Sequence, residues 1–336
     1  MRTAPVLDEV RSPSLDSATV DASVVIATAG RAAFLDGLVD ALERQTATGF
    51  EVLLVDDGST DGTWERLRSV ARTTALPLLA LRIAATGGPS VPRNTGVGRA
   101  RGEVLLFTDD DCLPEPGWVG ALRSALAAGD LARGPVHPAP DAHGAWDRSI
   151  DVPSPTPWYE TANLGVRRSA FVEAGGFPVL AVLGSLPGHR GFGEDVVLGH
   201  RLKEGRRETW APAAVVRHRW LPGTFADHLR ARRRLVGFPA LKRVAPQLAA
   251  ALPGGTFLNS RSLAFDVATV AAVAAALTRR PALLVAAAPW VRRAWPDARA
   301  RGGRSPIVRL AQLAVADAVG AAALLEGSVR HRAVVL

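Results

Sequence analysis

Three consecutive carboxylates follow a short apolar segment near the middle of the first half of the chain. Residues 104–107 have the continuous apolar pattern of a buried strand, and Thr108 leads from them into Asp109, Asp110 and Asp111. Ligands of open α/β sheets bind where such strands end, and adjacent carboxylates repel one another unless positive charge lies nearby. Because oxygen ligands suit Mg2+ or Mn2+, the cluster predicts a metal site; a solvated acidic turn is the alternative.

Two further acidic pairs stand where they could take part in chemistry. Asp56 and Asp57 follow the apolar segment 51–55, at a second predicted strand end. Glu194 and Asp195 follow the Gly-Phe-Gly residues 191–193 and begin a predicted helix, where the helix dipole stabilises negative charge. This last pair predicts either a reactive carboxylate or a simple helix cap.

Alternating strands and helices must position these carboxylates. Apolar strands are predicted at 23–28, 51–55, 78–83 and 104–107, with helices at 33–45, from about 63, and at about 93–100. Short connections between such elements favour a parallel sheet with right-handed crossovers. We therefore expect an α/β fold, with a Rossmann-like, mostly parallel sheet flanked by helices and the acidic strand ends on one edge.

Four segments in this order resemble the family 2 glycosyltransferases of GT-A fold. They cover residues 24–31, 55–63, 93–96 and 109–112. The resemblance implies a nucleotide-sugar site in which Asp56 and Asp57 contact the base and ribose, and Arg93 approaches the donor phosphates. The nucleotide-sugar-binding residues that it implies are Thr28, Arg31, Asp56, Asp57, Arg93, Asp109 and Asp110.

The same resemblance implies a divalent metal cofactor on the donor diphosphate. Asp109 and Asp111 take the positions of the family's D-x-D motif, Asp111 as the more direct ligand. His218 lies where some relatives place a third metal ligand, and a neutral imidazole suits Mn2+. A polar strand end is the other interpretation of His218.

The pair at 194–195 resembles the family's catalytic-base motif. Asp195 is then expected to deprotonate the acceptor hydroxyl, with Glu194 orienting it or shaping the acceptor pocket. Asn163 and Trp158 are expected on the acceptor side, although both could serve structure instead. Val197 stands where the family usually has an acid, and this departure bears on acceptor recognition.

These parts predict an inverting glycosyltransferase. A metal would stabilise the departing diphosphate, Asp195 would activate the acceptor, and the sugar would pass from a nucleotide-diphosphate sugar to a hydroxyl, in cell-envelope, polysaccharide or glycolipid synthesis. A sugar-nucleotide nucleotidyltransferase is an alternative, but only Thr28-Ala29-Gly30-Arg31 stands where its glycine-rich loop should lie. A non-catalytic nucleotide-binding module is a second alternative, which would not need both acidic motifs.

The charge changes sign along the chain. Residues 1–216 carry 21 basic and 27 acidic residues, whereas residues 217–336 carry 19 and 5. The acidic front part argues against a nucleic-acid partner, and the basic, Ala/Leu-rich back part favours an anionic membrane surface. Apolar helices there suggest a segment lying on lipid, with Trp290 and Trp295 at headgroup depth; a packed helical cap or a dimer interface is the alternative.

These patterns predict three parts. Residues 1–21 read as a polar tail, 22–223 as the GT-A domain, and 224–336 as the basic helical segment. Within the domain, 22–136 would form the nucleotide-sugar half and 137–223 the acceptor half, with the proline-rich residues 137–157 as an irregular connection or flap. A single cysteine, Cys112, and no recognisable signal peptide favour a cytoplasmic enzyme held on the inner face of the cell membrane.

Overall fold

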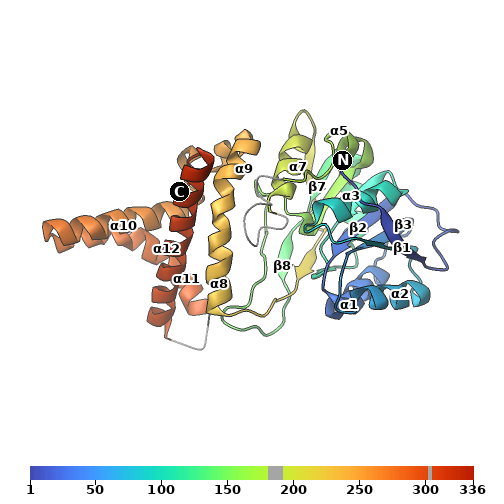
Figure 1. The fold of residues 1–336 in the computed structure, drawn as a ribbon, viewed down its shortest axis with the longest axis horizontal. Coiled ribbons are helices and arrows are strands. Elements are labelled where there is room, and N and C mark those ends of the chain that lie inside the picture. The colour runs from blue at the N-terminus through green and yellow to red at the C-terminus, as the bar shows by residue number, and fades with distance from the viewer. Residues whose placement is uncertain (181–191, 302–304) are drawn as a thin grey trace. The chain divides into compact units, whose positions relative to one another are not determined.

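Eight strands form the main sheet, in the order β1-β4-β3-β2-β5-β9-β7-β10. The computed structural model describes residues 1–180, 192–301 and 305–336 (Figure 1). Strands β2, β3, β4 and β5 are parallel to one another, as the alternating pattern predicts, whereas β9 is antiparallel to both β5 and β7. The strands are β1 (Val6–Arg11), β2 (Ala22–Thr28), β3 (Phe50–Asp57), β4 (Leu78–Ile83), β5 (Val104–Phe107), β7 (Leu131–Arg133), β9 (Leu164–Arg167) and β10 (Glu208–Trp210).

Strand β1 corrects the expectation of a polar tail over residues 1–21. It pairs antiparallel with β4 at the edge of the sheet. Its sequence, Val-Leu-Asp-Glu-Val-Arg, is half polar because the strand is only partly buried, so it lacks the apolar run that marks the inner strands. Short, charged edge strands of this kind also resist pairing with other chains.

Helices cover both faces of the sheet. On one face of the sheet, α1, α2 and α4 pack against side chains of β2 and β3 such as Val24 and Val52. On the other face, α3, α5 and α7 pack against the alternate side chains of the same strands, such as Val25 and Leu53. Figure 1 shows α1 and α2 on one face and α3 on the other. The helices are α1 (Ala32–Glu43), α2 (Thr63–Thr73), α3 (Ser90–Arg99), α4 (Trp118–Ala127), α5 (Arg168–Glu173) and α7 (Glu194–Lys203).

A second, three-stranded sheet lies beside the end of β5. It consists of β6 (Cys112–Pro114), β11 (Val216–His218) and β8 (Val136–Pro138), in the order β6-β11-β8. The antiparallel register of β6 and β11 sets His218 opposite Cys112. This small sheet therefore brings a histidine from late in the chain to the acidic cluster that follows β5.

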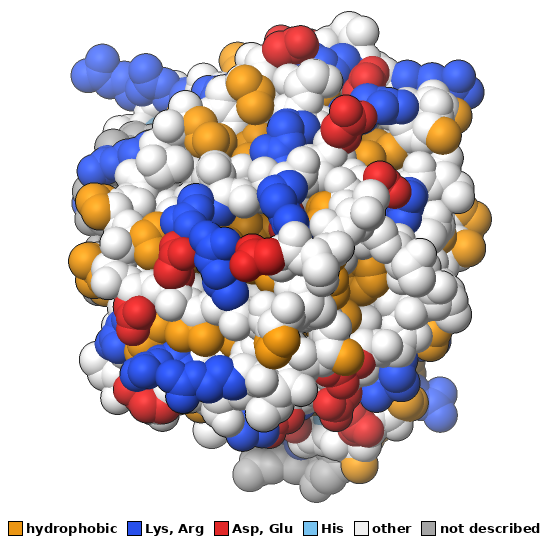
Figure 2. Space-filling model, turned by 90° about the vertical axis from the view of Figure 1, so that its right-hand side faces the viewer, with side chains coloured by type: hydrophobic (Ala, Val, Ile, Leu, Met, Phe, Trp, Pro, Cys, Tyr) orange, Lys and Arg blue, Asp and Glu red, His pale blue; other side chains and the backbone are white. Residues whose placement is uncertain are grey.

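The described chain divides into two compact units. The first comprises residues 1–140, 149–180 and 192–219, and the second residues 141–148, 220–301 and 305–336. Basic and acidic side chains are mixed on the face drawn in Figure 2. That face has the mixed charge of an ordinary solvated protein surface.

The second unit is helical. Trp146, Ala294 and Leu313 belong to its small apolar core. Residues 141–148, part of the expected irregular connection over 137–157, belong to this unit, and Trp146 is buried there. Its helices are α8 (Phe225–Arg233), the 3-10 helix η2 (Arg234–Gly237), α9 (Phe238–Val244), the 3-10 helices η3 (Pro246–Ala251) and η4 (Pro253–Gly255), α10 (Ser260–Thr278), the 3-10 helix η5 (Pro281–Ala287), α11 (Ala288–Ala300) and α12 (Pro306–His331).

Two of these helices are long and apolar enough to cross a membrane by length and composition, α10 and α12. They differ in their surroundings. On α12, Asp317 is 9% exposed and pairs with Arg261 of α10 at 2.9 Å and Arg232 of α8 at 3.3 Å. These ion pairs tie α12 to its neighbours at Asp317, whereas α10 leaves Val270 and Leu277 70% and 81% exposed and projects from its neighbours in Figure 1.

Trp290 corrects a second expectation. Its indole N–H donates a hydrogen bond to Asp317 at 2.9 Å, and the side chain is 8% exposed. It is part of the core of the second unit and does not lie at a lipid headgroup. A buried indole N–H needs a hydrogen-bond acceptor, and Asp317 supplies it.

Candidate functional site

The carboxyl ends of β2, β3 and β5 meet at one edge of the main sheet. Thr28, the last residue of β2, is in register with Asp56 of β3, and the loop after β5 carries Asp109, Asp110 and Asp111. The structure thus brings together the first two acidic motifs singled out in the sequence. The connecting loops are also tied to each other, since the Gly30 N–H donates to Ser59 Oγ at 2.9 Å and the Arg31 N–H to Thr63 Oγ1 at 2.9 Å.

Asp56 and Asp57 differ in their surroundings. Asp56 is fully buried, accepts a hydrogen bond from the Ser59 N–H at 3.1 Å and lies 3.6 Å from Arg82 Nε. Burial raises its pKa, against the lowering effect of Ser59. Asp57 is only partly buried, and one of its oxygens accepts hydrogen bonds from the Thr86 N–H and hydroxyl. Of the two, Asp57 is the more accessible to a ligand.

Arg31 provides positive charge beside the three-carboxylate cluster. Its guanidinium nitrogens lie 3.9 Å from Asp110 and 3.8 Å from Asp111. Burial raises the pKa of Asp110 to about 7, although the Thr28 hydroxyl and Arg31 both act to lower it. Burial and the charge of Asp109 likewise raise the pKa of Asp111. Asp110 and Asp111 therefore share one arginine, which lies nearly 4 Å from each, and this incomplete compensation is expected of a cation site.

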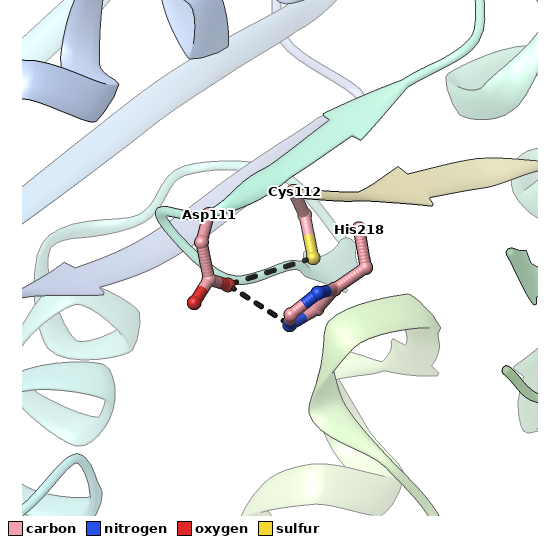
Figure 3. Close-up of side chains that lie close together, drawn as sticks. All are labelled: Asp111, Cys112 and His218. Carbon is pink, nitrogen blue, oxygen red and sulfur yellow. Dashed lines mark hydrogen bonds and ion pairs between the residues drawn. The ribbon is translucent and has the colours of Figure 1, made fainter. Parts of the chain in front are cut away.

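Asp111, Cys112 and His218 converge beyond the end of β5, with ligand atoms within 4.8 Å of one another (Figure 3). His218 Nε2 faces Asp111 Oδ1 at 3.5 Å. On the other side of the ring, Nδ1 lies 2.7 Å from the Arg219 carbonyl oxygen, which can only accept a hydrogen bond. Nδ1 therefore carries a proton, and Nε2 on the opposite side of the ring faces the Asp111 carboxylate.

Two electron-rich atoms that face each other at this distance need a proton or a cation between them. A second hydrogen bond that fixes the opposite nitrogen is also the usual arrangement of a metal-binding histidine. The residues thus fit a divalent cation held by Asp111 and His218. Burial and the neighbouring carboxylates raise the pKa of Cys112, which makes its thiol a poor ligand for a hard ion.

Asp109, the other expected metal ligand, lies in a different environment. Arg93 of α3 donates from Nη2 to Asp109 at 2.6 Å and from Nη1 to Glu194 at 3.0 Å. Arg93 is 5% exposed, and its guanidinium lies over the Phe177 ring, 5.3 Å from the centroid. The structure therefore joins the two acidic motifs, 109–111 and 194–195, through one buried arginine.

Glu194 and Asp195 form the first turn of α7. Gly193 precedes them with φ +77°, a left-handed conformation that glycine adopts at little cost, and this turns the chain into the helix. Asp195 is partly buried, and its carboxylate accepts a hydrogen bond from the Val196 N–H. Burial and the charge of Glu194 raise the pKa of Asp195 well above its usual range, which suits a general base. Gly191, the first residue of this motif, lies outside the described residues.

Asn163 corrects the expectation of an acceptor contact. It is 1% exposed, accepts from the Trp118 indole N–H at 2.8 Å, and donates to the carbonyl oxygens of Pro135 and Ala214. Asn163 therefore joins the segments that contain Trp118, Pro135 and Ala214, inside the first unit. Trp158 is only partly buried and precedes Tyr159, whose φ of +55° bends the chain.

Cys112 is the member of the cluster that sequence reasoning did not place in the site. Its side chain is fully buried. What brings it to the metal-ligand group is the register of β6 with β11, a pairing between short strands about one hundred residues apart. No local pattern in the sequence marks that pairing.

Comparison with known proteins gives one family model and several relatives. Residues 23–179 match the model described as glycosyl transferase family 2. Validoxylamine A glucosyltransferase from Streptomyces hygroscopicus subsp. jinggangensis is 28% identical over 255 residues, 62% of this chain and 56% of that relative. The protein of subspecies limoneus gives the same identity over 52% of its length. The chain thus spans little more than half the length of these curated relatives.

Two solved structures share the fold. Staphylococcus aureus TarS 1-349, in complex with UDP-GlcNAc, has 16% identity and a TM-score of 0.52, over 94% of this chain and 93% of that one. The mannosyltransferase PcManGT from Pyrobaculum calidifontis, in complex with GDP-Man and Mn2+, has 21% identity and a TM-score of 0.53, over 98% and 90%. The two structures show that the chain has the GT-A fold, and within it residues 23–179 belong to glycosyltransferase family 2.

Proposed function

We propose that this protein transfers a sugar from a nucleotide-diphosphate sugar to an acceptor hydroxyl, with inversion at the anomeric carbon. The observation that carries the proposal is the pair of hydrogen bonds from Arg93 to Asp109 and Glu194. They bring the motif suited to a metal-bound diphosphate and the motif suited to a base into one site. A sugar bound there would have its leaving group and its acceptor on opposite sides, as in-line displacement requires.

The donor would lie along the ends of β2, β3 and β5. We assign its nucleotide to the region of Thr28, Asp56 and Asp57, in which the partly exposed Asp57 makes the contact and the buried Asp56 holds the loop. Arg31, beside Asp110 and Asp111, would meet the diphosphate. The complexes of TarS with UDP-GlcNAc and of PcManGT with GDP-Man make a donor of this chemical class the natural candidate.

The chain's own residues divide the chemical work. A divalent cation held by Asp111 and His218 would stabilise negative charge on the departing diphosphate. Asp195 takes the proton of the acceptor hydroxyl as the hydroxyl oxygen forms its bond to the anomeric carbon and the bond to the diphosphate oxygen breaks. Glu194 holds the first turn of α7 through Arg93, and Trp158 is the acceptor-side candidate that the structure leaves accessible.

The test uses the full chain with a panel of UDP- and GDP-sugars, with Mn2+, Mg2+ or EDTA. We expect release of a nucleoside diphosphate that depends on the divalent ion, and an inverted product by NMR once an acceptor is found. Release of pyrophosphate from a nucleoside triphosphate and a sugar phosphate would instead identify a nucleotidyltransferase. Nucleotide binding without turnover of any donor would identify a non-catalytic module.

We also propose that the second unit holds the enzyme on an anionic membrane, as expected for cell-envelope or glycolipid synthesis. Val270 and Leu277 of α10 and Val285 of η5 are 70%, 81% and 75% exposed. Residues 267–296 contain four arginines and no acidic residue. Two copies of such a surface would repel each other, so its charge favours anionic lipid over a second copy of the chain.

A further inference from the structure

Arg93 is a buried cation between two carboxylates that belong to different motifs. Its side chain is 6% exposed, Asp109 is 31% exposed, and Glu194 is 8% exposed. Burial acts to lower the pKa of Arg93, and the charges of Asp109 and Glu194 outweigh it and raise that pKa. Each outer nitrogen of the guanidinium is therefore bound to a carboxylate, and little of the side chain is open to a donor phosphate.

We propose that Arg93 is a positioning residue that fixes the first turn of α7 against the Asp109 end of the metal motif and supplies the positive charge that balances Glu194 beside the base. The inference rests on the proposed function, in which Asp195 is that base. It replaces the expectation that Arg93 binds the donor phosphates. A planar guanidinium suits this task because its two outer nitrogens hold two carboxylates in fixed directions, which a lysine ammonium does not.

The charge balance follows from the groups that face Asp195. These are Glu194, which precedes it, Arg93 of α3, and Glu160. Without Arg93, Glu194 would be buried with no counter-charge, and its field would hold the proton on Asp195 to higher pH. Loss of Arg93 would thus leave Asp195 protonated, and unable to accept a proton, over a wider range of pH, and it would free the helix turn that carries Asp195.

Three variants test this in the full chain. Arg93→Gln removes the positive charge, and Arg93→Lys keeps the charge but lacks the two outer nitrogens of the guanidinium. Arg99→Gln is the control, because Arg99 lies on the same helix and pairs with Glu9. We expect Arg93→Gln to lower kcat about 100-fold or more, with donor affinity in Mn2+ changed by less than about threefold in calorimetry. Arg93→Lys should restore part of kcat, and Arg99→Gln should match the unchanged protein.

A second measurement does not need turnover. The Asp195 carboxyl can be titrated by carbon-13 NMR in protein with labelled aspartate, with Asp195→Asn assigning the signal. We expect Arg93→Gln to raise the pKa of Asp195, Glu194→Gln to lower it, and the double variant to lie between them. If the titration behaves so but the unchanged protein transfers no sugar, the proposed function fails and the positioning role stands. An unmoved Asp195 titration, or a large loss of donor affinity with normal kcat, would overturn the inference.

Discussion

At the scale of single residues, the site depends on how each carboxylate is compensated. Asp109 has Arg93, Asp110 and Asp111 share the more distant Arg31, and Asp111 faces His218. Adjacent residues of one acidic run therefore have different partners: Asp109 pairs with Arg93, which also binds Glu194 of α7, and Asp111 faces His218. The metal-ligand role of Asp109 stays a prediction.

Replacing Asp111 by Ala should abolish cation-dependent nucleotide binding. The variant removes the oxygen that faces His218, so we expect Mn2+-dependent affinity to fall at least about tenfold in calorimetry, with thermal stability nearly unchanged. Asp36→Ala, an exposed site on α1, is the matched control. Unaltered Mn2+-dependent affinity in Asp111→Ala would show that the cation binds elsewhere.

Asp195→Asn should lower kcat by about 10²- to 10⁴-fold while donor affinity stays the same, because the amide keeps the shape and cannot accept the proton. Stopped assays of sugar transfer measure kcat, and calorimetry measures the donor affinity. Should turnover survive, Glu194 would be the next residue to test as base.

The pH dependence of kcat reports on the same residue. The pKa of Asp195 is raised well above its ordinary value by burial and Glu194, so the deprotonated base is present only above that raised pKa. We expect kcat to fall as pH decreases through a value above the usual carboxyl range, and Glu194→Gln to move this limb to lower pH. A limb at the ordinary aspartate pKa would contradict the assignment.

At the scale of elements, local patterns predict the inner strands well because burial on both faces leaves continuous apolar runs in β2, β3 and β5. They do not predict β1, whose edge position leaves it half polar, or the pairing of β6 with β11, which joins short strands distant in the chain. The same limit applies to side chains: the sequence motifs predict Asp56, Asp111 and Asp195 as site residues, but they could not show that Asn163 is saturated by internal hydrogen bonds.

The helices of the second unit meet at a buried charge. Asp317 of α12 pairs with Arg232 of α8 and Arg261 of α10 and accepts from the Trp290 indole of α11. Because Asp317→Ala leaves two largely buried arginines without their partner, we expect a loss of about 3–5 kcal/mol of unfolding free energy in this unit. Glu326→Ala, an exposed acid on the same helix, is the control in chemical denaturation. Equal stability of the two variants would mean that the network contributes little.

At the scale of the whole molecule, the chain combines an acidic front part with a basic back part. Residues 1–216 have a net charge of −6 and residues 217–336 a net charge of +14. The first contains the proposed cation and nucleotide sites, and its negative charge near Asp110 and Asp111 would favour a cation there. In the proposed function, the positive charge of the second and its exposed apolar side chains on α10 and η5 together suit an anionic membrane surface.

The membrane proposal predicts that the full chain floats with vesicles rich in anionic lipid. Arg279, Arg280, Arg292 and Arg293 would contribute about 1 kcal/mol each near such a surface, a part that salt screens. Burial of Val270, Leu277 and Val285 would add about 1.5–3 kcal/mol each, a part that salt leaves intact. We therefore expect binding that needs anionic lipid, weakens with salt, and is largely lost when these three residues are changed to Ser.

The control changes Leu7 and Val172, exposed apolar residues of the first unit, to Ser. Flotation with neutral lipid alone that resists salt would indicate a spanning helix, and concentration-dependent dimers in sedimentation without flotation would assign the α10 and η5 surface to a second copy of the chain.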